Sequence, residues 1–153
     1  MKSRQIGEVI PDFSGIDQNG NPIKLSDYKQ RKGIIFFYPK ASTPGCTAEV
    51  CNLRDGYEIL KKQGFFLLGI SADSVKRQLN FAEKNQLPFP LIADENREII
   101  ELFGVWGQKK FMGKVFDGIH RKTFIIDENH QITHIIDKVQ TKNHTQQILS
   151  LVS

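Results

Sequence analysis

The stretch that decides the fold is "GIIFFYPKASTPGCTAEVCNLRD", residues Gly33–Asp55. Its first part, Gly33 to Pro39, is a continuous apolar run, which is typical of a central strand buried on both faces. From Pro44 onward, apolar residues recur every three or four positions, which indicates a helix. The sequence therefore predicts a strand that leads through a short loop into a helix.

The predicted helix contains both cysteines of the chain. Its apolar residues keep the helical spacing as far as Leu60, and Gly64 then provides a C-terminal signal. Cys46 and Cys51 are thus expected on one helix that runs from Pro44 almost to Gly64.

The remaining pattern alternates strands and helices. Upstream, Asn19-Gly20 predicts the tight turn of a β-hairpin within Asp12–Leu25. Downstream, we expect strands at 65–71, 90–94, 122–127 and 131–137, helices at 75–86, 97–103 and 145–152, and a Gly-rich loop after 103. Asp73 and Ser74 form a predicted capping pair for the second helix. Such alternation favours an α/β fold, with a mixed central sheet flanked by helices.

Composition limits the classes of function. With 153 residues and 39% hydrophobic residues, the chain fits a single domain spanning 1–153. The net charge of +4 comes from short clusters such as Lys29–Lys32, which argues against nucleic acid. No apolar run approaches the roughly 20 residues of a membrane span. Two cysteines are too few for a disulfide framework and no signal sequence is evident, so we expect a cytoplasmic protein.

Cys46 stands two residues after Pro44, at the start of the predicted helix. Unpaired backbone N–H groups and the helix dipole favour a thiolate there, and proline suits such a position because its φ is already helical. Gly45 keeps side-chain bulk away from the sulfur. A small buried apolar residue is the usual alternative, but the Pro-Gly pair before Cys46 and the polar Thr47 and Glu49 after it favour a reactive thiol.

The spacing of the two cysteines has a mechanical consequence. Five residues of ideal helix separate two Cα atoms by roughly 8–9 Å, whereas a disulfide requires less than about 7 Å. Cys46 and Cys51 can therefore form a disulfide only if the start of the helix unwinds. The spacing alone does not decide whether they do so, and Cys51 is equally compatible with a core cysteine that has no redox role.

Two other kinds of cysteine site fit the sequence less well. A structural zinc site needs four Cys or His ligands at characteristic spacings, and the histidines show no such pattern with the cysteines. We expect His130 in a turn and His134 on the face of a strand. Acyl transfer by a Cys–His pair needs a base that the sequence does not place beside Cys46, so it stays a minor alternative.

The segment "FYPKASTPGCTAEVCNLRD" closely resembles the signature of the peroxiredoxin Q group, also called bacterioferritin comigratory proteins, which are thiol peroxidases. It contains the peroxiredoxin pattern P-x-x-x-T-x-x-C at Pro39, Thr43 and Cys46, and Cys51 stands where that group has its second cysteine. The resemblance continues in "PDF" at 11–13, "GVWGQKKFMGK" at 104–114 and "GIHRKTFIID" at 118–127, so it covers nearly the whole chain.

This resemblance implies a thioredoxin-like fold with an N-terminal β-hairpin and a peroxidase that needs no cofactor or metal. Cys46 would reduce hydrogen peroxide and organic hydroperoxides and become a sulfenic acid. Cys51 would resolve it as an intramolecular disulfide, which thioredoxin or a similar dithiol protein would reduce. No membrane or nucleic-acid partner is implied, and we expect a monomer or at most a weak dimer.

The resemblance also implies roles for the neighbours of Cys46. Arg121 would hold the thiolate and place donors on the peroxide. Thr43 would offer its hydroxyl, and Pro39 would close one wall against water. Glu49 would either brace Arg121 or simply act as a favourable acid in a first helical turn.

Three residues depart from the family pattern, and two other functions remain as alternatives. The departures are Gln108 for Glu, Phe116 for Tyr and Lys122 for a small residue, and they bear on substrate preference or surface contacts. A thioredoxin-like copper-binding or redox module is one alternative, although such proteins usually space their cysteines more closely and add a histidine. A disulfide oxidoreductase is the other, although it would normally carry C-x-x-C.

Overall fold

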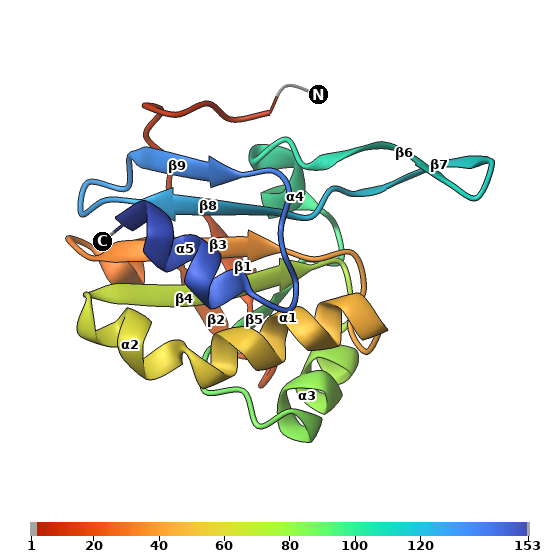
Figure 1. The fold of residues 1–153 in the computed structure, drawn as a ribbon, viewed down its shortest axis with the longest axis horizontal. Coiled ribbons are helices and arrows are strands. Elements are labelled where there is room, and N and C mark those ends of the chain that lie inside the picture. Colours follow the sequence, from red (N-terminus) through yellow and green to blue (C-terminus); the bar gives the residue numbers. More distant parts are fainter. Residues whose placement is uncertain (1–2, 153) are drawn as a thin grey trace.

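A five-stranded mixed sheet forms the centre of the molecule, as Figure 1 shows in a computed structural model that describes residues 3–152. Its strands are β3 (Lys32–Phe37), β4 (Phe65–Ser71), β5 (Leu91–Ala93), β8 (Lys122–Ile126) and β9 (Ile132–Ile136), in the order β5-β4-β3-β8-β9. β3 pairs in parallel with β4, and β4 with β5, whereas β8 is antiparallel to both β3 and β9. The predicted α/β class is confirmed.

Helices cover both faces of this sheet (Figure 1). They are α1 (Pro44–Asp55), α2 (Tyr57–Lys62), α3 (Val75–Lys84), α4 (Glu98–Leu102) and α5 (His144–Val152). Apart from α1 and α2, these helices and the strands at 65–71, 90–94, 122–127 and 131–137 lie within two residues of the predicted ranges.

The continuous apolar run of β3 reflects burial on two sides. Ile34 and Phe36 pack in one hydrophobic cluster with residues of α1, α2, α3 and α5. Ile35 and Phe37 belong to a second cluster, with α4 and the N-terminal hairpin. Because side chains alternate between the faces of a strand, a strand covered on both faces must be apolar throughout.

The long helix predicted from Pro44 is divided in the structure. α1 ends at Asp55 and α2 begins at Tyr57, with Gly56 between them at φ −93° and ψ 1°. A Cβ atom on Gly56 would lie 2.2 Å from Cγ2 of Thr145 in α5. The helical spacing continues across the break because both helices pack on the same sheet face, which is why the sequence pattern did not reveal it.

The N-terminal hairpin is confirmed, but its turn differs from the prediction. β1 (Ser14–Ile16) pairs antiparallel with β2 (Pro22–Lys24), and a short 3₁₀ helix, η1 (Leu25–Tyr28), follows. The connection runs from Asp17 to Asn21 instead of being a two-residue turn at Asn19-Gly20. The Asp17 carboxylate accepts backbone N–H bonds from residues 19 and 21, at 2.9 and 3.0 Å, and thereby organises this longer loop.

The predicted Gly-rich loop after residue 103 is instead a second hairpin. β6 (Trp106–Phe111) pairs antiparallel with β7 (Lys114–Ile119), and the hairpin projects well away from the sheet (Figure 1). Met112 and Gly113, with φ of 51° and 79°, form its two-residue turn. Most of its residues are exposed, so the buried alternation that identifies a strand in a sequence is missing here.

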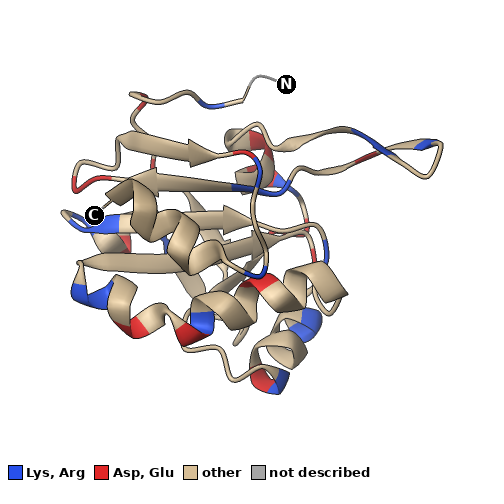
Figure 2. Ribbon diagram, in the orientation of Figure 1, with Lys and Arg blue, Asp and Glu red and all other residues tan. Residues whose placement is uncertain are grey.

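Charged residues are spread over the helices, strand ends and turns, and no single face gathers the basic ones in the view of Figure 2. Among the described residues, no helix is long and apolar enough to cross a membrane. His130 lies in a turn, with φ 60°, and His134 lies on β9, as predicted.

Gly56→Ala should destabilise the protein by about 1–3 kcal/mol, because the new methyl group has to displace Thr145 or shift α5. Urea denaturation measures the effect. Thr145→Ala in the same chain should recover part of the loss, since it removes the atoms that the methyl group meets. If Gly56→Ala were as stable as the wild type, α5 would be able to shift at this contact without a loss of stability.

Candidate active site

Cys46 lies in the first turn of α1, where Pro44 is the first helical residue and Thr43 the N-cap. N–H groups in the first turn of a helix lack intrahelical acceptors. The Thr43 hydroxyl does not cap them, because it donates to the carbonyl of Lys40 at 2.8 Å. The positive end of the helix is therefore directed at the Cys46 thiol, as the sequence predicts.

Arg121 is brought to Cys46 by the pairing of β8 with β3. Lys122 is opposite Phe37, at the end of β3 that leads into α1, so the preceding residue lies beside the start of the helix. Nη2 of Arg121 donates to Sγ of Cys46 at 3.4 Å. Burial acts to lower the pKa of Arg121, but the charges of Cys46 and Glu49 outweigh burial and raise it, so the guanidinium stays charged.

Glu49 provides the second contact of Arg121. Nη1 of Arg121 donates to Oε1 of Glu49 at 2.7 Å, and the glutamate is completely buried. Of the two predicted roles for Glu49, the structure thus supports the brace on Arg121. Burial raises the pKa of Glu49 to about 7, and Arg121 opposes this only in part.

Gly45 leaves room for the guanidinium. A Cβ atom at this position would lie 3.2 Å from Nη2 of Arg121. We predicted that Gly45 keeps bulk away from the sulfur of Cys46, whereas a side chain here would instead contact the arginine that holds this sulfur.

The loop between β3 and α1 is fixed by a residue for which we predicted a different role. Oδ2 of Asp73 accepts the backbone N–H of Ala41 at 2.7 Å and the Ser71 hydroxyl at 2.6 Å. Only Ser74 of the predicted capping pair caps α3, by accepting the N–H of Arg77 at 3.2 Å. Asp73 comes just after the carboxyl end of a buried strand, and this position in the sequence could have indicated a role at the site.

A groove of about 770 Å³ runs past this site. One wall comes from the α1 side of the site and includes Pro39, Thr43 and Arg121. The β6–β7 hairpin contributes the apolar side chains of Trp106, Phe111, Phe116 and Ile119 to the lining, together with Lys109 and Asp117. Cys46 itself is completely buried, so a reactant in the groove has to reach the sulfur past its neighbours.

Cys51 is half-buried on the same helix, and both cysteines are free. Its thiol donates to Oδ1 of Asn85, at the end of α3, at 3.4 Å. α1 is continuous from Pro44 to Asp55, so both cysteines lie on intact helix, as predicted.

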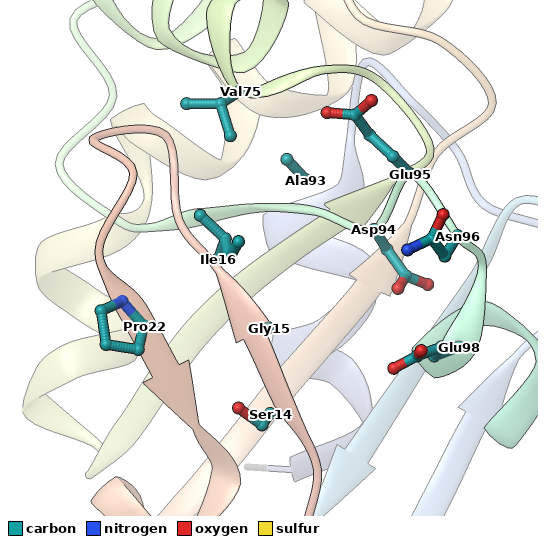
Figure 3. A pocket seen from close by; sticks show the side chains of 10 residues that line it. All are labelled: Ser14, Gly15, Ile16, Pro22, Val75, Ala93, Asp94, Glu95, Asn96 and Glu98. Carbon is teal, nitrogen blue, oxygen red and sulfur yellow. The ribbon is translucent and has the colours of Figure 1, made fainter.

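A second cavity lies beside the N-terminal hairpin and is not lined by either cysteine. It has a volume of about 490 Å³ and lies between β1, β2, β5 and the start of α4 (Figure 3). Its acidic residues are Asp94, Glu95 and Glu98, and Asp94 already accepts the N–H of Ile100 at 2.7 Å. Within residues 3–152, no three His, Cys, Asp or Glu side chains are grouped to hold a metal ion.

The three departures from the family pattern occupy different places. Phe116 lines the groove, where it presents an apolar ring without a hydroxyl. Lys122 forms an ion pair with Asp137, with 3.1 Å between Nζ and Oδ1. Gln108 is an exposed residue of β6, opposite Asp117.

Comparisons with known proteins agree on one family. The AhpC/TSA family matches residues 6–135. The chain is 45% identical to peroxiredoxin Bcp of Escherichia coli strain K12 over 150 residues, which cover 98% of this chain and 96% of the relative. It is 39% identical to peroxiredoxin Bcp of Bacillus subtilis strain 168 over 145 residues, covering 95% and 92%.

Solved structures support the same assignment. Bacterioferritin comigratory protein of Xanthomonas campestris, studied for its alkyl peroxide reduction, superposes with a TM-score of 0.85 at 31% identity, covering 92% of this chain and 89% of that one. Peroxidoxin BcpB of Mycobacterium tuberculosis superposes with a TM-score of 0.83 at 33% identity, covering 95% and 94%. The predicted thioredoxin-like architecture is thereby confirmed.

Arg121→Lys should slow the oxidation of Cys46 by hydrogen peroxide by about 10²-fold or more while leaving the fold intact. Lysine keeps the charge but cannot donate to Sγ of Cys46 and to Glu49 from one planar group. Stopped-flow fluorescence of Trp106 would follow the reaction, and Arg31→Lys, at an arginine that packs on Tyr28 away from the groove, is a matched control. Near-normal kinetics in Arg121→Lys would rule out a catalytic role for the guanidinium.

Proposed function

Because the chain belongs to the AhpC/TSA family and is a thiol-dependent peroxidase of the peroxiredoxin Bcp group, we propose that Cys46 is the thiol that reduces peroxide. The observation that carries this proposal is the 3.4 Å contact between Sγ of Cys46 and Arg121 at the open start of α1. The alternatives without peroxidase turnover, a copper-binding module and a disulfide oxidoreductase, have no comparable support at this site.

In the first step, the Cys46 thiolate attacks one oxygen of the peroxide. The S–O bond forms as the O–O bond breaks, and the departing oxygen leaves as hydroxide or alkoxide and takes up a proton. Cys46 becomes a sulfenic acid, two electrons more oxidised. Arg121 stabilises the negative charge as it moves from sulfur to the departing oxygen. The Thr43 hydroxyl donates to the Lys40 carbonyl, so it takes part by accepting the O–H of the peroxide.

The groove suits hydroperoxides that carry an apolar substituent. A peroxide at Cys46 would direct its substituent toward the ring of Phe116 and the neighbouring apolar side chains of the hairpin. We therefore propose that the enzyme accepts both hydrogen peroxide and organic hydroperoxides, and that the phenyl ring in place of tyrosine favours the latter.

Resolution by Cys51 requires the helix to open. Five residues of intact helix hold the two Cα atoms roughly 8–9 Å apart, which exceeds the reach of a disulfide. After the first turns unwind and the bond to Asn85 breaks, the Cys51 thiolate attacks the sulfur of Cys46. The S–S bond forms, and the hydroxyl of the sulfenic acid leaves and is protonated to water.

A dithiol protein of the thioredoxin type is the proposed reductant. Its thiolate attacks the disulfide, and its second thiol completes the exchange and returns both cysteines of this chain to thiols. Resolution takes place within one chain, so a monomer is sufficient for turnover.

Cys46→Ser should abolish turnover of both hydrogen peroxide and cumene hydroperoxide in a thioredoxin-coupled assay. Cys51→Ser is the matched control, because it should consume one equivalent of peroxide and then stall as a sulfenic acid open to over-oxidation. Mass spectrometry identifies both products. Sustained thioredoxin-dependent turnover by Cys46→Ser would refute the proposed role of this thiol.

Oxidation of the wild-type enzyme should melt the start of α1. Amide hydrogen exchange between Thr43 and Leu53 should be slow in the dithiol form and much faster in the disulfide form, while Ile34–Phe37 in the central strand stays protected. A protected helix in the oxidised form, or the lack of a bond between Cys46 and Cys51, would mean that an external thiol performs resolution.

A further inference from the structure

The buried carboxyl group of Glu49 is only half satisfied. Oε1 receives the hydrogen bond from Arg121, but Oε2 has no hydrogen-bond partner among the described residues. A buried, unpaired carboxylate oxygen is costly and calls for an explanation. Nε2 of His144, a fully buried residue of α5, lies 3.7 Å from this oxygen.

The hydrogen bonds of Gln147 fix which nitrogen of His144 carries the proton. Oε1 of Gln147 accepts the backbone N–H of Gln140 at 3.0 Å, and its Nε2 donates to the carbonyl of Lys138 at 2.8 Å. The amide oxygen therefore faces Nδ1 of His144 at 2.8 Å, so Nδ1 must be the donor. In neutral His144, Nε2 then carries no proton, and its single lone pair accepts the Thr123 hydroxyl at 2.7 Å.

Oε2 of Glu49 thus faces a nitrogen that has no proton to donate, and a proton on Oε2 itself would remove the unpaired buried charge. Burial raises the pKa of Glu49 to about 7 and lowers the pKa of His144 to about 4, so the proton resides on the carboxyl group. Arg121 is the charged group facing this pair from the start of β8, and Cys46 lies one turn earlier on α1.

We propose that His144 is a positioning residue that shares one proton with Glu49, and that this proton sets the net charge that Arg121 presents to Cys46. While the proton is present, Glu49 is neutral and the whole charge of Arg121 acts on the thiolate. When the proton is lost, Glu49 is an anion that neutralises part of this charge. The effect on Cys46 rests on the proposed function, whereas the shared proton does not.

Folding then moves a proton from one residue to the other. With ordinary values of 4.5 for Glu49 and 6.5 for His144, the unfolded chain between these pH values holds the proton on the imidazole. The folded protein holds it on the carboxyl group. Because both states bind one proton, the pair makes stability neither rise nor fall across this window.

The two single variants should change the pH dependence of stability in opposite directions. In Glu49→Gln, the remaining His144 is neutral when folded but protonated when unfolded, so stability relative to wild type should rise with pH from about 4.5 to 6.5. In His144→Leu, the remaining Glu49 is protonated when folded but ionised when unfolded, so relative stability should fall over the same range. Urea denaturation at several pH values measures both differences, and His134→Gln on β9 is a matched control.

A second measurement covers the case in which His144→Leu does not fold. The ring ¹⁵N shifts of His144 should show the Nδ1–H tautomer and a titration near pH 7 in the wild type, and Glu49→Gln should remove that titration. If stability changed equally with pH in the two variants, or if the histidine shifts did not respond to Glu49→Gln, the proposal that the pair shares one proton would be wrong.

The effect on Cys46 is tested by the rate of its oxidation. Glu49→Gln imitates the protonated state, because it is neutral and its oxygen can accept from Arg121 while its NH₂ group faces Nε2 of His144. The ratio of its oxidation rate constant to that of the wild type should stay near one in acid and rise severalfold as the pH passes about 7. A ratio independent of pH would show that the pair does not act on Cys46. Failure of the proposed function itself would appear separately, as turnover retained by Cys46→Ser.

Discussion

The buried contact between Arg121 and Glu49 is the constraint on which the rest of the site depends. It joins α1 to the start of β8 across the end of the sheet, and the same guanidinium reaches the sulfur of Cys46. Charges are costly to bury, and removing one partner of such a pair leaves the other uncompensated. The brace therefore holds the thiol, the helix start and the sheet in one arrangement, and small changes in the charge of any member affect all three.

Much of this arrangement was predictable because its signals are local. The apolar run of β3, Pro44 at the first helical position and the spacing of Pro39, Thr43 and Cys46 are each contained in a few consecutive residues. Arg121 was predictable only through resemblance to a family, since a lone arginine before a strand carries no signal of its own. The pairing of β8 with β3 explains why that position reaches the helix.

What the sequence did not reveal depends on contacts between distant segments. The break at Gly56 exists because Thr145 packs there, and helical spacing is unaffected by it. The exposed β6–β7 hairpin has no buried alternation, and its best signal was the pair Met112-Gly113 at the turn. His144 lies 95 residues after Glu49 in the sequence, and only the packing of α5 against α1 brings the two together.

The position of Glu49 between the two cysteines ties its ionisation to the opening of α1. Any unwinding that lets the sulfur atoms meet must pull Glu49 away from Arg121, which is cheaper for a neutral acid than for half of a buried ion pair. Oxidation weakens the other contact of Arg121, because a sulfenic acid lacks the negative charge with which the Cys46 thiolate holds the guanidinium. A protonated Glu49 thus favours both the thiolate before the reaction and the release of the helix after it, and His144 favours this proton because its Nε2 has none to donate to the carboxylate.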